Sequence, residues 1–215
     1  MKGEDAGQLK LDMAELYMKL GQHDKSERML SRELEVKVDN SDLLALTAPT
    51  KLLLLLSKVW EKAVNIQASL TTLTDAHDNQ SRVLKIMAVD QSGGNMEERK
   101  VAANICQQMA EYAYMLRDHD AAIHFYMEAL AYSPENTNSS VDLARLCMQV
   151  NDLEQCQMSY MTLLKAVANN EAATVMMADM VFRKVDFEMA AFLFQQLLQR
   201  RPNYWTALAK LVQGM

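Results

Sequence analysis

The chain has 215 residues, half of them hydrophobic, and contains only 6 glycines and 3 prolines. This composition favours an all-helical fold over one rich in strands and turns. The net charge of −6 argues against binding to a nucleic-acid backbone, which requires a basic face. Cys106, Cys147 and Cys156 form no CxxC pair and follow no signal peptide, so we expect reduced thiols in the cytoplasm.

The first 38 residues predict one pair of helices over 7–38. Apolar residues recur at helical spacing up to Gly21, which stands where a helix-terminating glycine belongs. Ala14 and Ser26 are then the small residues at which the two helices cross, because a larger side chain there would push the backbones apart.

A second helix pair is predicted over 44–89, with its turn at Ser57-Lys58. Here we assign the small crossing residue to Ala63 and interpret Trp60 as a packing aromatic in the turn. The second helix of the pair is extended, either as one long helix or as two halves broken near 75–79. A polar linker follows over 90–97.

Three further helix pairs follow with a period of 34 residues, over 103–136, 137–170 and 171–204. Small residues recur at equivalent positions, and an aspartate in each turn can accept from free N–H groups of the next helix. The residues that carry the period are Ala110, Ala144, Ala178, Asp118, Asp152 and Asp186.

This fixed period with small residues at set positions is typical of tetratricopeptide repeats (TPR). We therefore predict an all-α, right-handed TPR solenoid of about five helix-turn-helix repeats plus the start of a sixth. Residues 205–215 supply a truncated first helix of that sixth repeat. No polar capping helix follows it, so we expect the sequence to be a piece of a longer array.

The run of five leucines from Leu52 to Leu56 is too short to span a membrane, which takes about 20 apolar residues. We place Leu52, Leu55 and Leu56 on the groove side of the second repeat. The helix is then apolar on all sides and must be buried. The sequence predicts that a partner segment, or another part of the parent chain, occupies the groove at this point.

The first helices of TPR repeats line a concave groove, so their outward residues are candidate protein-binding residues. The candidates form a mixed, partly apolar surface, a composition typical of protein-binding faces. Some of them would alternatively face the neighbouring turn of the solenoid. Beyond the leucines they are Tyr114, Met115, Arg145, Met148, Asp179, Phe182 and Arg183.

We find no catalytic motif and predict no catalytic, cofactor-binding or metal-binding residue. Asp120 and His124, with His119 adjacent, have metal-ligand spacing on one helix face. The simpler interpretation is that His119 fills the turn and Asp120 favours a helix N-terminus. Cys147 and Cys156 belong to one repeat, and we interpret them as small core thiols.

Two stretches carry a more specific resemblance than the repeat pattern does. They are ICQQMAEYAYMLRDHDAAIHFYMEAL over 105–130 and NNEAATVMMADMVFRKVDFEMAAFLFQQLLQRRPNYWTAL over 169–208. Both resemble the TPR subunit family of intraflagellar transport complex A. That resemblance implies a non-enzymatic scaffold that binds other complex A subunits, serves retrograde transport and cilium assembly, and lies in the cytoplasm and at the cilium or ciliary base.

For the partner, the sequence predicts an extended or helical protein segment in the groove, with no nucleic acid and no direct membrane insertion. The acidic tails that co-chaperone TPR domains bind do not fit, because Gln107, Glu111 and Asp142 would repel a carboxylate. Two alternatives stay open: a TPR adaptor of another assembly, of chaperone or cell-cycle type, and a regulatory TPR arm of an enzyme.

Overall fold

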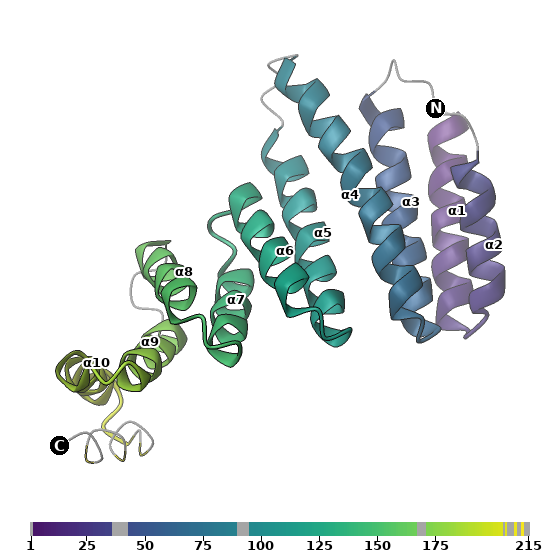
Figure 1. Cartoon of the computed structure of the whole chain (residues 1–215). Coiled ribbons are helices and arrows are strands. Elements are labelled where there is room, and N and C mark those ends of the chain that lie inside the picture. The colour runs from purple at the N-terminus through teal and green to yellow at the C-terminus, as the bar shows by residue number, and fades with distance from the viewer. Residues whose placement is uncertain are drawn as a thin grey trace. The chain divides into compact units, whose positions relative to one another are not determined.

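The computed structural model describes residues 2–35, 43–89, 95–166 and 171–203, together with positions 205, 209 and 212. Ten α-helices and no strand occur in these residues (Figure 1). None of the helices there is long and apolar enough to cross a lipid bilayer. The chain forms two compact units, residues 1–132 and 133–215.

The first unit holds six helices, each joined to the next so that neighbours lie side by side (Figure 1). They are α1 (Lys2–Lys19), α2 (His23–Leu34), α3 (Leu43–Lys62), α4 (Ile66–Val89), α5 (Asn95–Met115) and α6 (His119–Tyr132).

The second unit contains four shorter helices, again arranged as two hairpins. These are α7 (Thr137–Gln149), α8 (Leu153–Ala166), α9 (Glu171–Arg183) and α10 (Phe187–Arg200). The predicted first helix of a sixth repeat, 205–215, lies mostly outside the described residues.

The turn within each hairpin contains one residue in the left-handed backbone conformation. Gly21 takes this place in the first hairpin with φ 72°, and four residues with side chains take it in the others. Because the left-handed region reverses the chain in a single step, all five hairpins turn in the same way. The other four are Val64, Arg117, Asn151 and Val185.

In four of the five hairpins, the side chain of the residue after the left-handed position caps the helix that follows. Asp118 accepts from the N–H of Ala121 at 3.0 Å, and Asp152 and Asp186 accept equivalently from Gln155 and Met189. These bonds confirm the predicted role of the three aspartates. In the second hairpin the cap is Asn65, whereas Gln22 makes no side-chain cap bond in the first.

The predicted crossing of Ala14 with Ser26 is confirmed, and the same spacing of small buried residues recurs in the other hairpins. Five positions beyond each left-handed residue lies a buried small residue, and another lies twelve residues earlier on the first helix of the same pair. Ser26 Oγ donates to the carbonyl of Ala14 at 2.8 Å, and Cys156 Sγ donates to the carbonyl of Ala144 at 3.4 Å. Ala110 and Ala122, like Ala178 and Ala190, have the same spacing and are buried.

The register predicted for the second repeat was wrong. α3 continues through Ser57-Lys58 to Lys62, so Trp60 lies inside this helix and packs against its core, while Ala63 is exposed in the turn. The crossing residues are instead Ser57 and Ser69, both fully buried, and Ser69 Oγ donates to the carbonyl of Ser57 at 2.8 Å. The error arose because a small residue and an aromatic neighbour occur by chance six positions earlier.

α4 is a single helix of 24 residues, which decides between the two predicted forms of the extended second helix. Its added turns pack against the start of α5, where Gln80 Nε2 donates to the carboxylate of Glu98 at 2.6 Å. Arg99 then donates to the carbonyls of Ala131 and Tyr132 at the end of α6. The predicted linker over 90–97 overlaps α5 from Asn95, and 90–94 lie outside the described residues.

The left-handed turn residues provide a matched test of backbone strain. A non-glycine residue in this conformation costs about 1–2 kcal/mol, and Val64 is 84% exposed, so its side chain contributes little packing. We expect Val64→Gly to raise the free energy of unfolding by about 1 kcal/mol in urea denaturation. Gly21→Val should lower it by a similar amount, because a Cβ at Gly21 meets no atom within 4 Å and only the backbone conformation is strained. A destabilising Val64→Gly would contradict this account.

Candidate protein-binding face

Aligning the crossing residues of the five first helices identifies one outward face on each. The positions one, four and five residues after the crossing residue are exposed or half-buried in every repeat. The positions one before and two after are buried in α3, α5, α7 and α9. Each first helix therefore has a face that packs into the core and a face that is accessible to a ligand.

Leu55 and Leu56 do not belong to the accessible face. They are 6% and 7% exposed and lie in a core cluster with residues of α1 and α2, and Leu52 packs against the same cluster. Leu53 and Leu54 pack on the opposite side, against residues of α4 and α5. The leucine run is buried or half-buried, but the chain's own helices cover it and no partner is needed.

With the corrected register, the accessible side of α3 carries three lysines and one acidic residue, Glu61. Lys51, Lys58 and Lys62 are all exposed, and none of them is paired with a carboxylate in the described part of the chain. Their spacing of seven and four residues places them along one side of the helix. We call these three residues the lysine face.

Tyr114 and Met115, two of the predicted binding residues, lie at the end of α5 and are both exposed. Tyr114 is 40% exposed and its ring lies 5.6 Å from that of His119, while Met115 is 59% exposed. The lysine face and these two residues occupy corresponding first helices, α3 and α5, which contribute to one core cluster. Together they provide positive charge, an aromatic and a thioether side chain.

The second unit carries the remaining predicted residues on α7 and α9. Arg145 is exposed and its Nη1 lies 2.8 Å from Asp142 Oδ1, whereas Met148 and Asp179 are half-buried. Phe182 is half-buried as well, because its ring packs edge-on against Phe187 and Phe194 of α10. Arg183 is exposed. Phe182 therefore helps to hold the last hairpin together in addition to any contact with a ligand.

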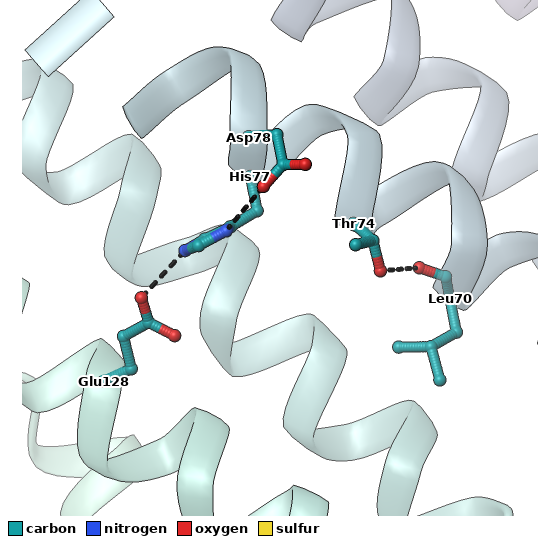
Figure 2. A network of polar contacts seen from close by, with 5 residues as sticks. All are labelled: Leu70, Thr74, His77, Asp78 and Glu128. Carbon is teal, nitrogen blue, oxygen red and sulfur yellow. Dashed lines mark hydrogen bonds and ion pairs between the residues drawn. The ribbon is translucent and has the colours of Figure 1, made fainter. Parts of the chain in front are cut away.

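A polar network in the first unit was not predicted from the sequence. His77 on α4 lies between two carboxylates: its Nε2 is 2.9 Å from Glu128 Oε1 on α6, and its Nδ1 is 3.7 Å from Asp78 Oδ1 (Figure 2). Nearby on α4, Thr74 donates to the carbonyl of Leu70 at 3.0 Å. No local motif marks the contact between His77 and Glu128, because the two residues are 51 positions apart in the sequence.

Asp120, His124 and His119, which have metal-ligand spacing in the sequence, do not converge on one point in the structure. His119 packs against Tyr114 in the turn, and Asp120 and His124 are exposed on α6. These residues do not appear among the three-ligand groups that the described residues form.

All three cysteines are buried, in line with their interpretation as core thiols. Burial raises the pKa of Cys147 from its ordinary value of 9.0 to about 12, with added repulsion from Asp152 and Cys156. Burial, followed by the charge of Glu128, raises the pKa of Cys106 to about 12 as well. Tyr112 also has a raised pKa, chiefly from burial.

Antiparallel helix pairs that cross at small residues and share one accessible face define a helical-repeat protein of the TPR class. Family models agree: the fourth ARM domain of tetratricopeptide repeat protein 21 matches residues 1–130, its fifth ARM repeats domain matches 171–215, and a general tetratricopeptide repeat matches 113–180. The chain belongs to the tetratricopeptide repeat protein 21 family.

Curated relatives support the same membership. The chain is 35% identical to tetratricopeptide repeat protein 21A of Mus musculus and 33% identical to that of Homo sapiens, in both cases over 94% of its length. It is 32% identical to tetratricopeptide repeat protein 21B of Xenopus laevis. The chain spans about 15% of the length of each of these relatives.

Solved structures with little sequence similarity share the fold. A tetratricopeptide repeat protein from Parabacteroides merdae superimposes with a TM-score of 0.62 at 13% identity, covering 98% of this chain and 72% of that one. The MamA protein gives a TM-score of 0.60 at 13% identity, covering 94% of this chain and 96% of its own. These likenesses confirm the predicted class of all-α TPR fold.

The position of Leu55 in the core can be tested by truncation. We expect Leu55→Ala to lower the free energy of unfolding by about 3 kcal/mol, because it removes buried apolar contacts and leaves a cavity. Leu16→Ala, at an α1 residue that is 56% exposed, should change it by less than about 0.5 kcal/mol. Urea denaturation measures both. If Leu55 were part of a vacant binding groove, its truncation would leave stability unchanged.

The raised pKa of Cys147 predicts a dependence of stability on pH. Between pH 9 and about 12 the folded chain keeps the thiol proton that the unfolded chain releases, so this contribution is complete below pH 9 and is lost as the pH rises. Cys147→Ala should reduce the fall in unfolding free energy above pH 9 by about 1.4 kcal/mol per pH unit, the effect of one proton. Leu146→Ala, a buried neighbour without a proton to lose, should lower stability without altering the slope.

Proposed function

We propose that this chain is a scaffold segment of the intraflagellar transport machinery that binds other subunits of complex A. Membership of the tetratricopeptide repeat protein 21 family supports the proposal, together with the resemblance over 105–130 and 169–208. In this proposal the chain is not an enzyme, acts in retrograde transport and cilium assembly, and lies in the cytoplasm and cilium.

The observation that carries the binding role is the accessible side of the first helices. Five consecutive first helices present side chains that the fold itself leaves exposed or half-buried. Within each compact unit, first helices with this property offer positions to a protein segment without disturbing the core. The residues differ from repeat to repeat, so each helix can contribute its own specificity.

The lysine face gives the proposed partner a charge. Lys51, Lys58 and Lys62 have no carboxylate partner in the described residues, although the chain as a whole carries a net charge of −6. Complementary charge favours the association of an acidic, extended or helical protein segment. Tyr114 and Met115 on the neighbouring first helix suit the apolar side chains of such a segment, since tyrosine and methionine are enriched in interfaces.

Charge reversal on the lysine face tests this role. We expect Lys58→Glu combined with Lys62→Glu to reduce the recovery of complex A subunits from ciliated cells about tenfold, because two favourable charge pairs become repulsive. The matched control, Arg82→Glu with Lys85→Glu, makes the same change in net charge at exposed positions of α4. Quantitative mass spectrometry of the tagged chain measures both.

Two outcomes would count against the proposal. Equal losses in both double variants would show that overall charge matters and the lysine face does not. Recovery of co-chaperones in place of transport subunits would instead reject the assignment to complex A and favour an adaptor of another assembly.

A further inference from the structure

Three side chains with metal-ligand atoms converge inside the first unit, each from a different helix. His77 comes from α4, Cys106 from α5 and Glu128 from α6. One ligand atom of each lies within 4.8 Å of the other two, and His77 Nε2 is 2.9 Å from Glu128 Oε1. In the part of the chain that the structure describes, it is the one group of at least three His, Cys, Asp or Glu side chains with ligand atoms this close together.

The set of atoms matches the chemistry of a transition metal. Imidazole nitrogen, thiolate sulfur and carboxylate oxygen are the three ligand types that zinc takes in proteins, with bonds of about 2.0–2.3 Å. Tetrahedral geometry at these bond lengths separates neighbouring ligand atoms by about 3.3–3.8 Å. The observed spacing of up to 4.8 Å needs only small side-chain movements to reach this range.

The surroundings supply the two further features of a metal site. Asp78 Oδ1 lies 3.7 Å from His77 Nδ1 while Nε2 faces Glu128, so the carboxylate can orient the imidazole that binds through its other nitrogen (Figure 2). An open cavity of about 380 Å³, lined by Leu84, Arg99, Glu128, Ala131 and Tyr132, gives solvent access beside Glu128. It provides an entry path and room for a water as the fourth ligand.

We propose that His77, Cys106 and Glu128 bind one zinc ion that joins α4, α5 and α6. Binding forms Zn–N, Zn–S and Zn–O bonds, replaces the hydrogen bond between His77 and Glu128, and releases the thiol proton of Cys106 to solvent. The site lies where the extended α4 meets the repeat that follows. An ion there would fix the relative positions of the second and third hairpins within the first unit.

A zinc titration of the chelator-treated chain tests the site, with Zn²⁺ alone as the ligand in isothermal titration calorimetry. We expect one ion per chain, and Co²⁺ in place of zinc should give a thiolate-to-cobalt charge-transfer band. Cys106→Ser should abolish that band and weaken zinc binding at least about 100-fold, because one of three protein ligands is lost. Cys147→Ser, which removes a buried thiol of the second unit, should change neither.

Two further variants separate metal binding from a purely structural contact. Glu128→Gln keeps a hydrogen-bonding partner for His77 but weakens a metal ligand, and Asp78→Asn removes the orienting charge. We expect both to lower zinc affinity by about 10-fold to 100-fold while circular dichroism shows an unchanged helical content. If Cys106→Ser does not fold, Glu128→Gln decides the question.

The proposal is overturned if the chain binds no stoichiometric zinc, which would leave the group as a hydrogen bond beside a core thiol. It is also overturned if the folded Cys106→Ser or Glu128→Gln variant binds zinc as tightly as the wild type. A cobalt band that Cys147→Ser removes would equally reject it, since the thiolate ligand would then lie in the other unit.

Discussion

The close crossing of two helices at a pair of small residues is the constraint on which each repeat depends. Ser26 and Ser69 each donate to a first-helix carbonyl twelve residues earlier at 2.8 Å, which joins the two helices at their closest point. Where alanine takes this place, as at Ala122 and Ala190, the side chain is buried and can make no hydrogen bond. Because the crossing fixes which way each helix faces, it also determines which residues are buried and which can meet a ligand.

This dependence explains both the success and the failure of sequence-based prediction. In the last three repeats the crossing residue, the capping aspartate and the period all agree, so the fold and the accessible positions follow from the sequence. In the second repeat Ala63 satisfies the small-residue pattern, but the chain crosses at Ser69, six residues later. That error rotated the whole of α3 in the prediction. It placed leucines in the groove at positions where the structure has lysines.

The extended α4 shows a second limit of local patterns. Asp75 to Asn79 is polar, which is compatible either with a break or with a helix whose polar residues meet other helices. The structure has the second: Asn79 Nδ2 donates to Thr50 Oγ1 at 2.8 Å, and His77 contacts Glu128, 51 residues away. Contacts between residues so far apart produce no recognisable spacing in the sequence. The convergence of His77, Cys106 and Glu128 could therefore not be predicted from it.

The regular repeats and the irregular one therefore have different roles in the molecule. Regular hairpins need only small crossing residues, so their outward positions are free to vary and suit the recognition of a partner. At the extension, by contrast, polar and ionisable groups lie between three helices, where leaving them without partners would be costly. Their mutual contacts tie α4 to α5 and α6 in one arrangement. The departure from the 34-residue period thus adds a specific polar connection, which the generic apolar stacking of regular repeats does not provide.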